Sequence, residues 1–457
     1  MRHDHPMPGE ILAALGLDHG VAARFGVAGG ERLPSCFAVT DLATASIGAA
    51  GLAAAELLAL GGIAAPGVMV DRHLANSWFR WSLKPVGWEM PAPWDPMAGD
   101  YRAADGWIRL HTNAPMHRDA ALAVLGCAGE REAVAARVAG YGADALEQAI
   151  VAAGGCAAAM RSVAAWEAHP QGRAAMAEPL VALTQSRASG PSRWTPTAQR
   201  PLAGIRVLDL TRVLAGPVAT RFLAGLGADV LRIDPPGWEE PGVIPDVTLG
   251  KRCARLDLHA PADRERFEAL LVQADILVHG YRPGALEGLG YGPAARRAIN
   301  AAMVEVSLCA YGWSGPWAAR RGFDSLVQMS CGIAAAGMAW KGADRPVPLP
   351  VQALDHATGY LMAAAALSGL IARHRDGVAQ TARLSLARTA ELLVARVAQP
   401  SEVDSAPVGQ VDFAAAIEPT PWGDARRLRS PVTIGGIPLS WSRPAAMLGS
   451  SAAAWED

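Results

Sequence analysis

The sequence predicts an α/β fold built on a doubly wound, mostly parallel sheet. From residue 201 onward, short runs rich in β-branched residues alternate with amphipathic stretches of helical length. Strands that alternate with such helices form right-handed βαβ crossovers, which place the strands side by side in a sheet covered on both faces. The chain has 457 residues, enough for roughly two or three domains.

The elements follow one another in a regular order. The predicted strands are 205–210, 229–234, 276–280 and 303–308, and the predicted helices are 217–227, 261–273 and 284–300. Ligands of such sheets bind beyond the carboxyl ends of the strands. The segments at those ends are polar and rich in glycine, but they contain neither a GxGxxG nor a GxxxxGK[ST] pattern. We therefore expect a nucleotide pocket without an NAD fingerprint or a P-loop.

Composition excludes several classes of function. The 41 basic residues are scattered among 43 acidic ones and the net charge is −2, so no surface for nucleic acid is expected. The six cysteines form no CxxC pair, which favours free thiols in a reducing cytoplasm. The start has no signal-peptide core, and the apolar stretch 42–60 contains Glu56, which favours a buried helix over a membrane span.

One internal repeat is visible. Residues 40–50 resemble residues 354–364 without a gap, and the aspartates Asp41 and Asp355 are 355 − 41 = 314 residues apart. Both copies carry the pattern D-x-A-T and open a long apolar helix. The pattern favours a duplication, and an aspartate that caps a helix is the alternative explanation.

Six stretches occur in a characteristic order between residues 201 and 390: LAGIRVLDLTRVLAGP (202–217), LGADVLRIDPPG (226–237), GKRCARLDL (250–258), ADILVHGYRPGALEGLGYG (274–292), SLCAYGWSGPWAARRGFDSLVQ (307–328) and LDHATGY (354–360). With these motifs, residues 201–390 resemble the class III CoA-transferase family, also called the CaiB/BaiF type. The resemblance implies a Rossmann-like CoA domain with a smaller α/β domain, a homodimer whose chains can interlock, and acyl-CoA as a substrate with no metal and no tightly bound cofactor.

The resemblance also implies where CoA binds. Family members hold CoA over the carboxyl edge of the sheet, where Lys and Arg suit its phosphates and a helix start adds a positive dipole end. The alternative for Arg232 and Arg252 is a solvated surface position. The corresponding residues here are Arg212, Leu214, Ala215, Arg232, Lys251, Arg252, Tyr281 and Arg282.

Asp355 matches the nucleophile of the family. A carboxylate there attacks the thioester, forms an acyl anhydride and then an aspartyl-CoA thioester, which an incoming carboxylic acid resolves. The alternative is that Asp355 only caps its helix. Asp324 is a secondary catalytic candidate, because some transferases keep a carboxylate near the site.

Two other functions remain as alternatives. Related racemases use a histidine before the aspartate that matches Asp324, but Phe323 stands there, and His356 beside the nucleophile is weak evidence for a second base. A non-catalytic acyl-CoA-binding pseudo-enzyme or partner subunit is the other alternative. It is motivated by the unusual order of the parts and by the lack of a clear Gly-rich covering loop.

The order of the parts departs from the family. The segments 101–107 (YRAADGW) and 166–171 resemble its small domain but precede the CoA domain, so the small domain folds over the sheet within one chain or across two. Asp41 would be a relic of a second nucleophile position. Gly435–Gly436 and Gly61–Gly62 are faint candidates for the covering loop, with hairpin turns as the favoured interpretation.

We divide the chain into an N-terminal segment (1–34), a partial copy with the small domain (35–185), a linker (186–200), the CoA-binding transferase domain (201–395) and a shortened C-terminal tail (396–457).

Overall fold

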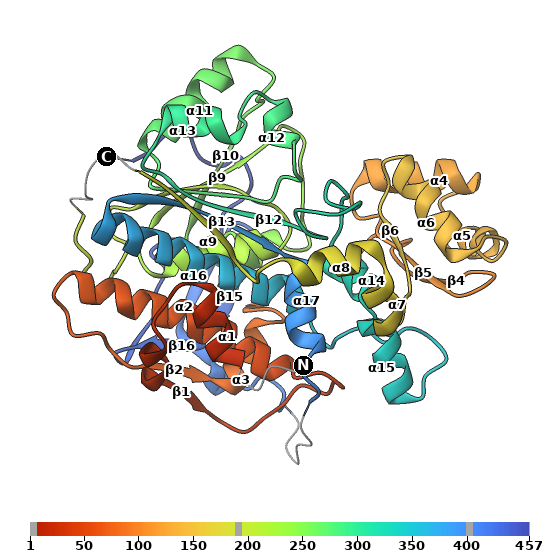
Figure 1. Cartoon of the computed structure of the whole chain (residues 1–457), viewed down its shortest axis with the longest axis horizontal. Helices are drawn as coiled ribbons and strands as arrows, with labels where there is room; N and C mark the ends of the chain where they lie inside the picture. Colours follow the sequence, from red (N-terminus) through yellow and green to blue (C-terminus); the bar gives the residue numbers. More distant parts are fainter. Residues whose placement is uncertain (1–6, 188–193, 399–404, 457) are drawn as a thin grey trace.

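A seven-stranded sheet forms the centre of the protein. The structure is a computed structural model that describes residues 7–187, 194–398 and 405–456. The strand order is β10-β9-β8-β11-β12-β13-β7, and all neighbours are parallel except β13 and β7. The prediction of a doubly wound, mostly parallel α/β sheet is confirmed (Figure 1). The strands are β7 (Ala182–Arg187), β8 (Arg206–Leu210), β9 (Asp229–Asp234), β10 (Lys251–Arg255), β11 (Ile276–His279), β12 (Val304–Cys309) and β13 (Val378–Ser385).

Helices cover both faces of this sheet. Successive residues of a strand point to opposite faces, so Val207 packs with α9 and α16 whereas Leu208 packs with α11. This two-sided burial explains why the strands are nearly continuous apolar runs. The predicted helix 284–300 is two helices, because Gly290 adopts φ +90° and Pro293 starts a new one. The helices are α9 (Ala215–Gly225), α11 (Pro261–Gln273), α12 (Ala285–Gly288), α13 (Pro293–Ile299) and α16 (Ala353–Asp376).

The internal repeat extends over three consecutive elements. Helix α2 (Val39–Leu60) and α16 begin 353 − 39 = 314 residues apart, and α3 (Arg72–Trp78) and α17 (Leu386–Val394) begin 386 − 72 = 314 residues apart. In each copy a strand, β2 (Val68–Asp71) or β13, lies between the two helices. A constant offset through helix, strand and helix supports a duplication.

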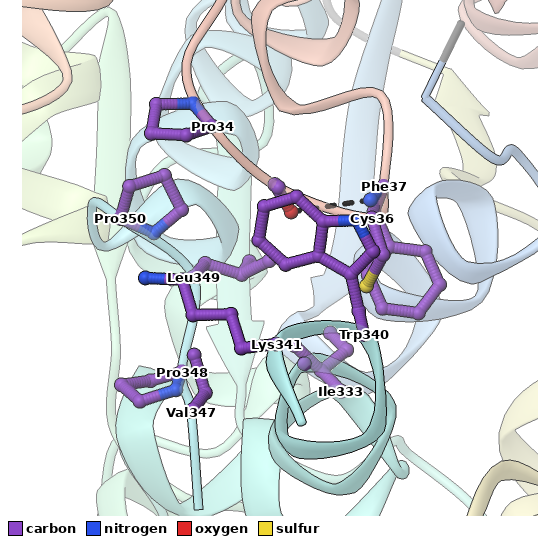
Figure 2. A pocket seen from close by; sticks show the side chains of 12 residues that line it. Pro34, Cys36, Phe37, Ile333, Trp340, Lys341, Val347, Pro348, Leu349 and Pro350 are labelled. Carbon is purple, nitrogen blue, oxygen red and sulfur yellow. Dashed lines mark hydrogen bonds between the residues drawn. The ribbon is translucent and has the colours of Figure 1, made fainter. Parts of the chain in front are cut away.

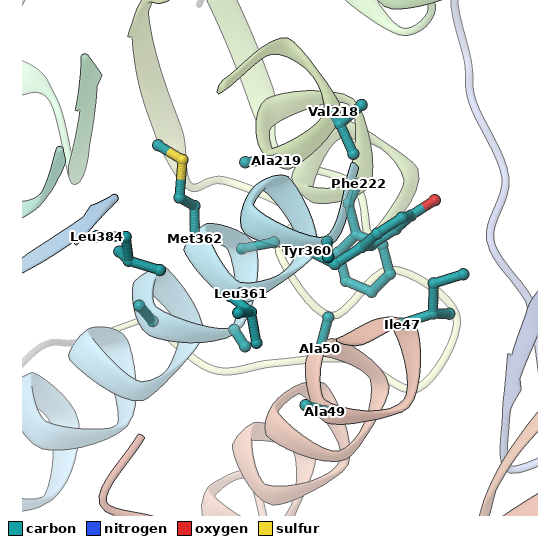
Figure 3. Packing of buried hydrophobic residues seen from close by; sticks show 14 of the residues in the cluster. Ile47, Ala49, Ala50, Val218, Ala219, Phe222, Tyr360, Leu361, Met362 and Leu384 are labelled. Atoms are coloured by element: carbon teal, nitrogen blue, oxygen red, sulfur yellow. The ribbon is translucent and has the colours of Figure 1, made fainter. Parts of the chain in front are cut away.

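The two long helices of the repeat pack against each other. Figure 3 shows Ile47 and Ala50 of α2 near Tyr360 and Leu361 of α16, with Phe222 of α9 completing the contact. Among the described residues α2 is the only helix long and apolar enough to cross a membrane. It is mostly buried in the protein core, as the sequence predicted for the stretch that contains Glu56.

The smaller α/β domain is a separate lobe with its own core. Its antiparallel sheet has the order β4-β5-β6 and carries three helices on one side (Figure 1). Helix α14 (Asp324–Ser330), which follows the large sheet in sequence, packs on β5 and β6 and joins the two lobes. The elements of the small domain are β4 (Gly99–Arg102), β5 (Trp107–Leu110), α4 (Pro115–Leu125), α5 (Arg131–Val138), α6 (Ala143–Ala152) and β6 (Ala157–Ala159).

The C-terminal strands pair with strands from the first hundred residues. Strand β16 pairs with β2, and β15 pairs with β3. Gly435 and Gly436 form the tight β16–β17 hairpin with φ of +60° and +79°, as predicted, whereas Gly61 and Gly62 follow the end of α2 and form no hairpin. These strands are β1 (Phe25–Ala28), β3 (Leu83–Pro85), β14 (Phe413–Thr420), β15 (Gly423–Leu428), β16 (Val432–Ile434) and β17 (Ile437–Pro438). The remaining helices are α1 (Met7–Ala14), η1 (His19–Arg24), α7 (Val163–Ala168), α8 (Pro170–Ala177), α10 (Ile244–Val247), α15 (Ile333–Lys341) and η2 (Gln410–Asp412).

Candidate functional site

A cavity of about 520 Å³ opens at the carboxyl ends of β8, β11 and β12. Residues that end or follow these strands line it, including Leu210, Gly280 and Cys309, and Asp355 forms part of its wall. A parallel sheet binds ligands at this edge because the strand ends and the helix N-termini meet there. The cavity therefore lies where the sequence predicted a ligand.

Asp355 is placed at the third position of α16 and is only 7% exposed. Burial raises the pKa of its carboxyl group well above the usual range, and the nearby carboxylate of Asp324 raises this pKa further. Both effects disfavour the ionised form. Asp355 is thus a buried, basic carboxylate at the wall of a cavity, which is an environment typical of functional carboxylates.

Asp324 supports Asp355 from behind the cavity wall. It opens α14, is 2% exposed, and its Oδ2 accepts the backbone N–H of Asp355 at 3.0 Å. Its other oxygen accepts a hydrogen bond from Gln328, and burial raises the pKa of Asp324 as well. Asp324 is not among the residues that line the cavity. It ties the start of α14 to the start of α16.

Five of the residues predicted to bind CoA line the cavity. The guanidinium of Arg212 lies 4.7 Å from the ring centroid of Trp238 and 5.2 Å from that of Tyr281, and it donates a hydrogen bond to the Tyr281 hydroxyl at 3.0 Å. Within the described ranges no carboxylate forms an ion pair with Arg212. Its charge is therefore available for an anionic ligand. The five are Arg212, Leu214, Ala215, Tyr281 and Arg282.

Three predicted phosphate ligands, Arg232, Lys251 and Arg252, lie elsewhere. They are at most 6% exposed and do not line the cavity. Each pairs with an aspartate of the same sheet, so their charges are already neutralised inside the protein. The prediction that they contact CoA is not supported, and neither Arg232 nor Arg252 is a solvated surface residue. The pairs are Arg232–Asp234 at 2.8 Å, Lys251–Asp209 at 3.0 Å and Arg252–Asp229 at 2.8 Å.

The small domain supplies cavity residues that the sequence did not reveal. Met116 and His117, at the start of α4, line the cavity together with Phe323. Burial lowers the pKa of His117 to about 4, and Arg321 contributes, so this imidazole is neutral near neutral pH. Phe323 stacks on His111 with ring centroids 3.7 Å apart. No local signal marks His117, because its position depends on how the small domain packs on the large sheet.

Two other residues, Cys309 and Asp41, are poor candidates for chemistry. Cys309 lines the cavity, but burial raises the pKa of its thiol to about 12, so little thiolate exists at neutral pH. Asp41, the repeat partner of Asp355, lies in ion pairs with Arg72 at 2.7 Å and Arg32 at 3.6 Å. These ion pairs indicate a structural role for Asp41.

A second cavity is too small for a cofactor-sized ligand. It measures about 70 Å³ and lies between residues 34–37 and α15 with the loop that follows it. Figure 2 shows Trp340 and Lys341 facing Pro34 and Cys36 across it. Ligand sites usually occupy a few hundred Å³ or more, so the larger cavity is the candidate site.

Comparisons with known proteins concern the same part of the chain. A family model described as CoA-transferase family III matches residues 202–417. The probable fatty acyl-CoA transferase of Mycobacterium tuberculosis is 34% identical over 206 residues, which are 42% of this chain and 52% of that protein. The succinyl-CoA:glutarate CoA-transferase of Mus musculus is 32% identical over 42% of this chain and 48% of that protein. The chain thus spans about half the length of these curated relatives.

One comparison is with a solved structure. A crystal structure of the Mycobacterium tuberculosis protein aligns with a TM-score of 0.40 and 34% sequence identity. The alignment covers 43% of this chain and 55% of that chain.

The buried carboxylate predicts a pH-dependent stability difference. A raised pKa in the folded state means that folding loses stability as the pH rises from the unfolded value, about 4, through the folded value. Asp355→Asn should therefore raise the melting temperature at about pH 8, by roughly 2 °C or more, and this gain should shrink towards pH 4. Calorimetry across this range measures the difference.

The control is the matched repeat residue. Asp41→Asn loses a half-exposed ion pair, which is worth about 0–1 kcal/mol, and should be neutral or slightly destabilising. If the melting temperature of Asp355→Asn stays below that of the parent protein at every pH, the buried carboxylate does not destabilise the fold as expected.

Proposed function

We propose that the protein moves CoA between an acyl-CoA and a carboxylic acid, because residues 202–417 match the family model described as CoA-transferase family III. One observation carries the proposal: the buried Asp355 carboxylate and the unpaired Arg212 guanidinium line one cavity at the carboxyl edge of the sheet. The first is a nucleophile suited to thioesters and the second is a cation suited to phosphates.

The cavity has the features that CoA binding requires. Arg212 and Arg282 offer positive charge, and Trp238 and Tyr281 offer aromatic faces. Helix α9 begins at the cavity wall with Ala215, so its N-terminal N–H groups and dipole favour an anion there. We propose that the phosphates of CoA lie on this side and that the thioester reaches Asp355.

The proposed chemistry uses only Asp355 and the two substrates. The carboxylate attacks the thioester carbonyl, forming an acyl–aspartyl anhydride and releasing CoA thiolate. The thiolate attacks the aspartyl carbonyl, which releases the first carboxylic acid as its anion and leaves aspartyl-CoA. The incoming carboxylate then attacks the carbonyl of aspartyl-CoA, forms a second anhydride and releases CoA thiolate again. The thiolate attacks the acyl carbonyl of this anhydride, which yields the new acyl-CoA and regenerates Asp355.

Burial of Asp355 serves both halves of this cycle. A carboxylate with a raised pKa is a better nucleophile than a solvated one, and a dry site protects the anhydride and the thioester from hydrolysis. Asp324 keeps the start of α16 in place through the backbone N–H of Asp355. We propose Asp324 as a positioning residue rather than a second nucleophile.

The partners that we propose are an acyl-CoA, a carboxylic acid and a second copy of the chain, in the cytoplasm. The names of the related transferases support the two substrates. All six cysteines are free, which is consistent with a reducing compartment.

A second candidate function is α-proton exchange on an acyl-CoA. Phe323 occupies the position where the racemases have a histidine base. However, His117 from the small domain lines the same cavity as Asp355. Two titratable groups at one cavity could remove and return a proton. This function predicts uptake of deuterium from solvent at the α-carbon without any carboxylic acid, measured by mass spectrometry, and its loss in His117→Ala. Transfer of CoA without such uptake would exclude it.

The transferase proposal predicts the effect of Asp355→Asn. The amide cannot form the anhydride, so acyl exchange should fall by at least ~10³-fold, whereas CoA binding should be preserved. Exchange is measured with isotopically labelled carboxylic acid, and binding by calorimetry. Asp41→Asn is the matched control and should transfer CoA at the parent rate.

Trapping separates an enzyme from a pure binder. Hydroxylamine added with acyl-CoA should give a hydroxamate on Asp355, detected by peptide mass spectrometry. Transfer by Asp355→Asn at the parent rate would refute the assignment. The absence of any adduct in a parent protein that binds CoA would favour the pseudo-enzyme.

The carboxylate pair also predicts the pH dependence of transfer. Only ionised Asp355 attacks, so kcat should rise with pH through its raised pKa and then level off. Asp324→Asn removes the negative charge that raises the pKa of Asp355, so the acid limb should move to lower pH. The amide oxygen of the variant still accepts the Asp355 N–H, so the start of α16 stays in place. The profile of kcat against pH measures the shift. An unmoved limb would show that the charge of Asp324 does not act on the nucleophile.

A further inference from the structure

We propose that Glu240, held by Arg232, is a positioning residue that sets the Arg212 side of the cavity for CoA. The inference rests on the proposed function and assigns a role to the two buried residues. Glu240 is 8% exposed and Arg232 is fully buried, and neither lines the cavity. Their effect must therefore reach the ligand through other residues.

Glu240 joins two cavity loops with one carboxylate. Its Oε1 accepts the backbone N–H of Val213 at 2.8 Å and the indole N–H of Trp238 at 2.7 Å. Its Oε2 accepts a hydrogen bond from Arg232 at 2.9 Å. Val213 follows β8 and Trp238 follows β9, and both line the cavity. The loops after these two neighbouring strands are thus tied to one buried group.

Val213 needs such a tie. Its φ is +63°, and it is the only non-glycine residue with positive φ in the described ranges. A β-branched side chain in this region is strained, and such strain persists only where the surroundings hold it. Val213 lies between Arg212 and Leu214, which both line the cavity. The hydrogen bond to Glu240 therefore holds the turn that presents Arg212.

Trp238 is the second contact that the carboxylate fixes. The hydrogen bond to Glu240 orients its indole, whose ring faces the Arg212 guanidinium, and Tyr281 contacts the same guanidinium. A guanidinium held between two aromatic rings loses little conformational entropy when it binds a phosphate. Glu240 therefore favours CoA binding indirectly, because it helps to hold the Arg212 side chain in position before the ligand arrives.

Arg232 holds the Glu240 carboxylate in place. It binds Asp234 through two hydrogen bonds, at 2.8 and 2.9 Å, and Glu240 through a third. One buried cation thus serves two carboxylates, and these carboxylates raise the pKa of Arg232, so its charge is retained. This geometry explains why an arginine in the predicted CoA-binding stretch does not reach the cavity.

Glu240→Gln tests the inference. The amide can still accept from Val213 and Trp238, but its NH₂ group then faces the donors of Arg232. The Kd for coenzyme A, measured by calorimetry on the full chain, should rise about 10-fold, and KM for acyl-CoA should rise in parallel with kcat within about 2-fold. Asp355→Asn changes kcat instead. Glu239→Gln, an exposed neighbour paired with Arg255, is the matched control and should bind CoA as the parent does.

Rescue distinguishes positioning from general damage. Glycine adopts positive φ without strain, so Val213→Gly added to Glu240→Gln should recover much of the lost affinity. Trp238→Phe keeps the aromatic face at this half-buried position and removes the N–H that Glu240 accepts, so it should also weaken CoA binding. Hydrogen exchange of residues 211–215 without ligand should be faster in Glu240→Gln and return towards the parent in the double variant.

The outcomes separate the two proposals. If the parent binds CoA and both Glu240→Gln and Trp238→Phe bind it equally well, the positioning role is overturned and the transferase proposal stands. If the parent binds no CoA, the proposed function is overturned, and with it the assignment of this carboxylate to CoA. Weaker binding in both variants with rescue by Val213→Gly supports the inference.

Discussion

The structure depends on holding one carboxylate inside the protein at the start of α16. Asp355 has no cationic partner in the described residues, and its nearest acidic neighbour, Asp324, adds repulsion. Burial of a charge without a partner is costly, so the helix that carries it must be held firmly. Helix α16 is buried along almost its entire length between α2, α9 and the sheet, and Gly359 allows α9 to approach its backbone closely. The packing of this helix offsets the cost of burying the Asp355 carboxylate in its first turn.

The duplication shows that the helix alone does not make the site. Asp41 and Asp355 occupy the same place in two copies of a helix, strand and helix. Asp355 faces the edge of a parallel sheet with several strand ends, whereas Asp41 meets Arg72 and Arg32 and is half-exposed. A carboxylate held in ion pairs with two arginines is stable but a weak nucleophile. The difference in chemistry between the copies comes from what surrounds the aspartate.

Much of the fold and part of the site could be predicted from the sequence, for physical reasons. Strands buried on both faces are apolar runs, so β8, β9, β11 and β12 were found, and the nucleophile candidate lies at the cavity because helix starts gather at the carboxyl edge. Strand β10 was missed because it begins with Lys251 and Arg252. Their partners, Asp209 and Asp229, are distant in sequence, so no local pattern shows that these charges are neutralised inside.

The same charge accounting explains which cations can meet a ligand. Lys251 and Arg232 lie beneath the sheet edge, and each is matched by carboxylates of the same region. These carboxylates offset the positive charges of Lys251 and Arg232, so the two cations contribute little positive field at the cavity. Arg212 differs because aromatic rings, not carboxylates, surround its guanidinium. The charge of an arginine that contacts only aromatic rings can pair with an incoming anion. The charge of an arginine that is ion-paired with carboxylates is already neutralised. The type of neighbour, more than the presence of Arg or Lys at a strand end, therefore decides where phosphates can bind.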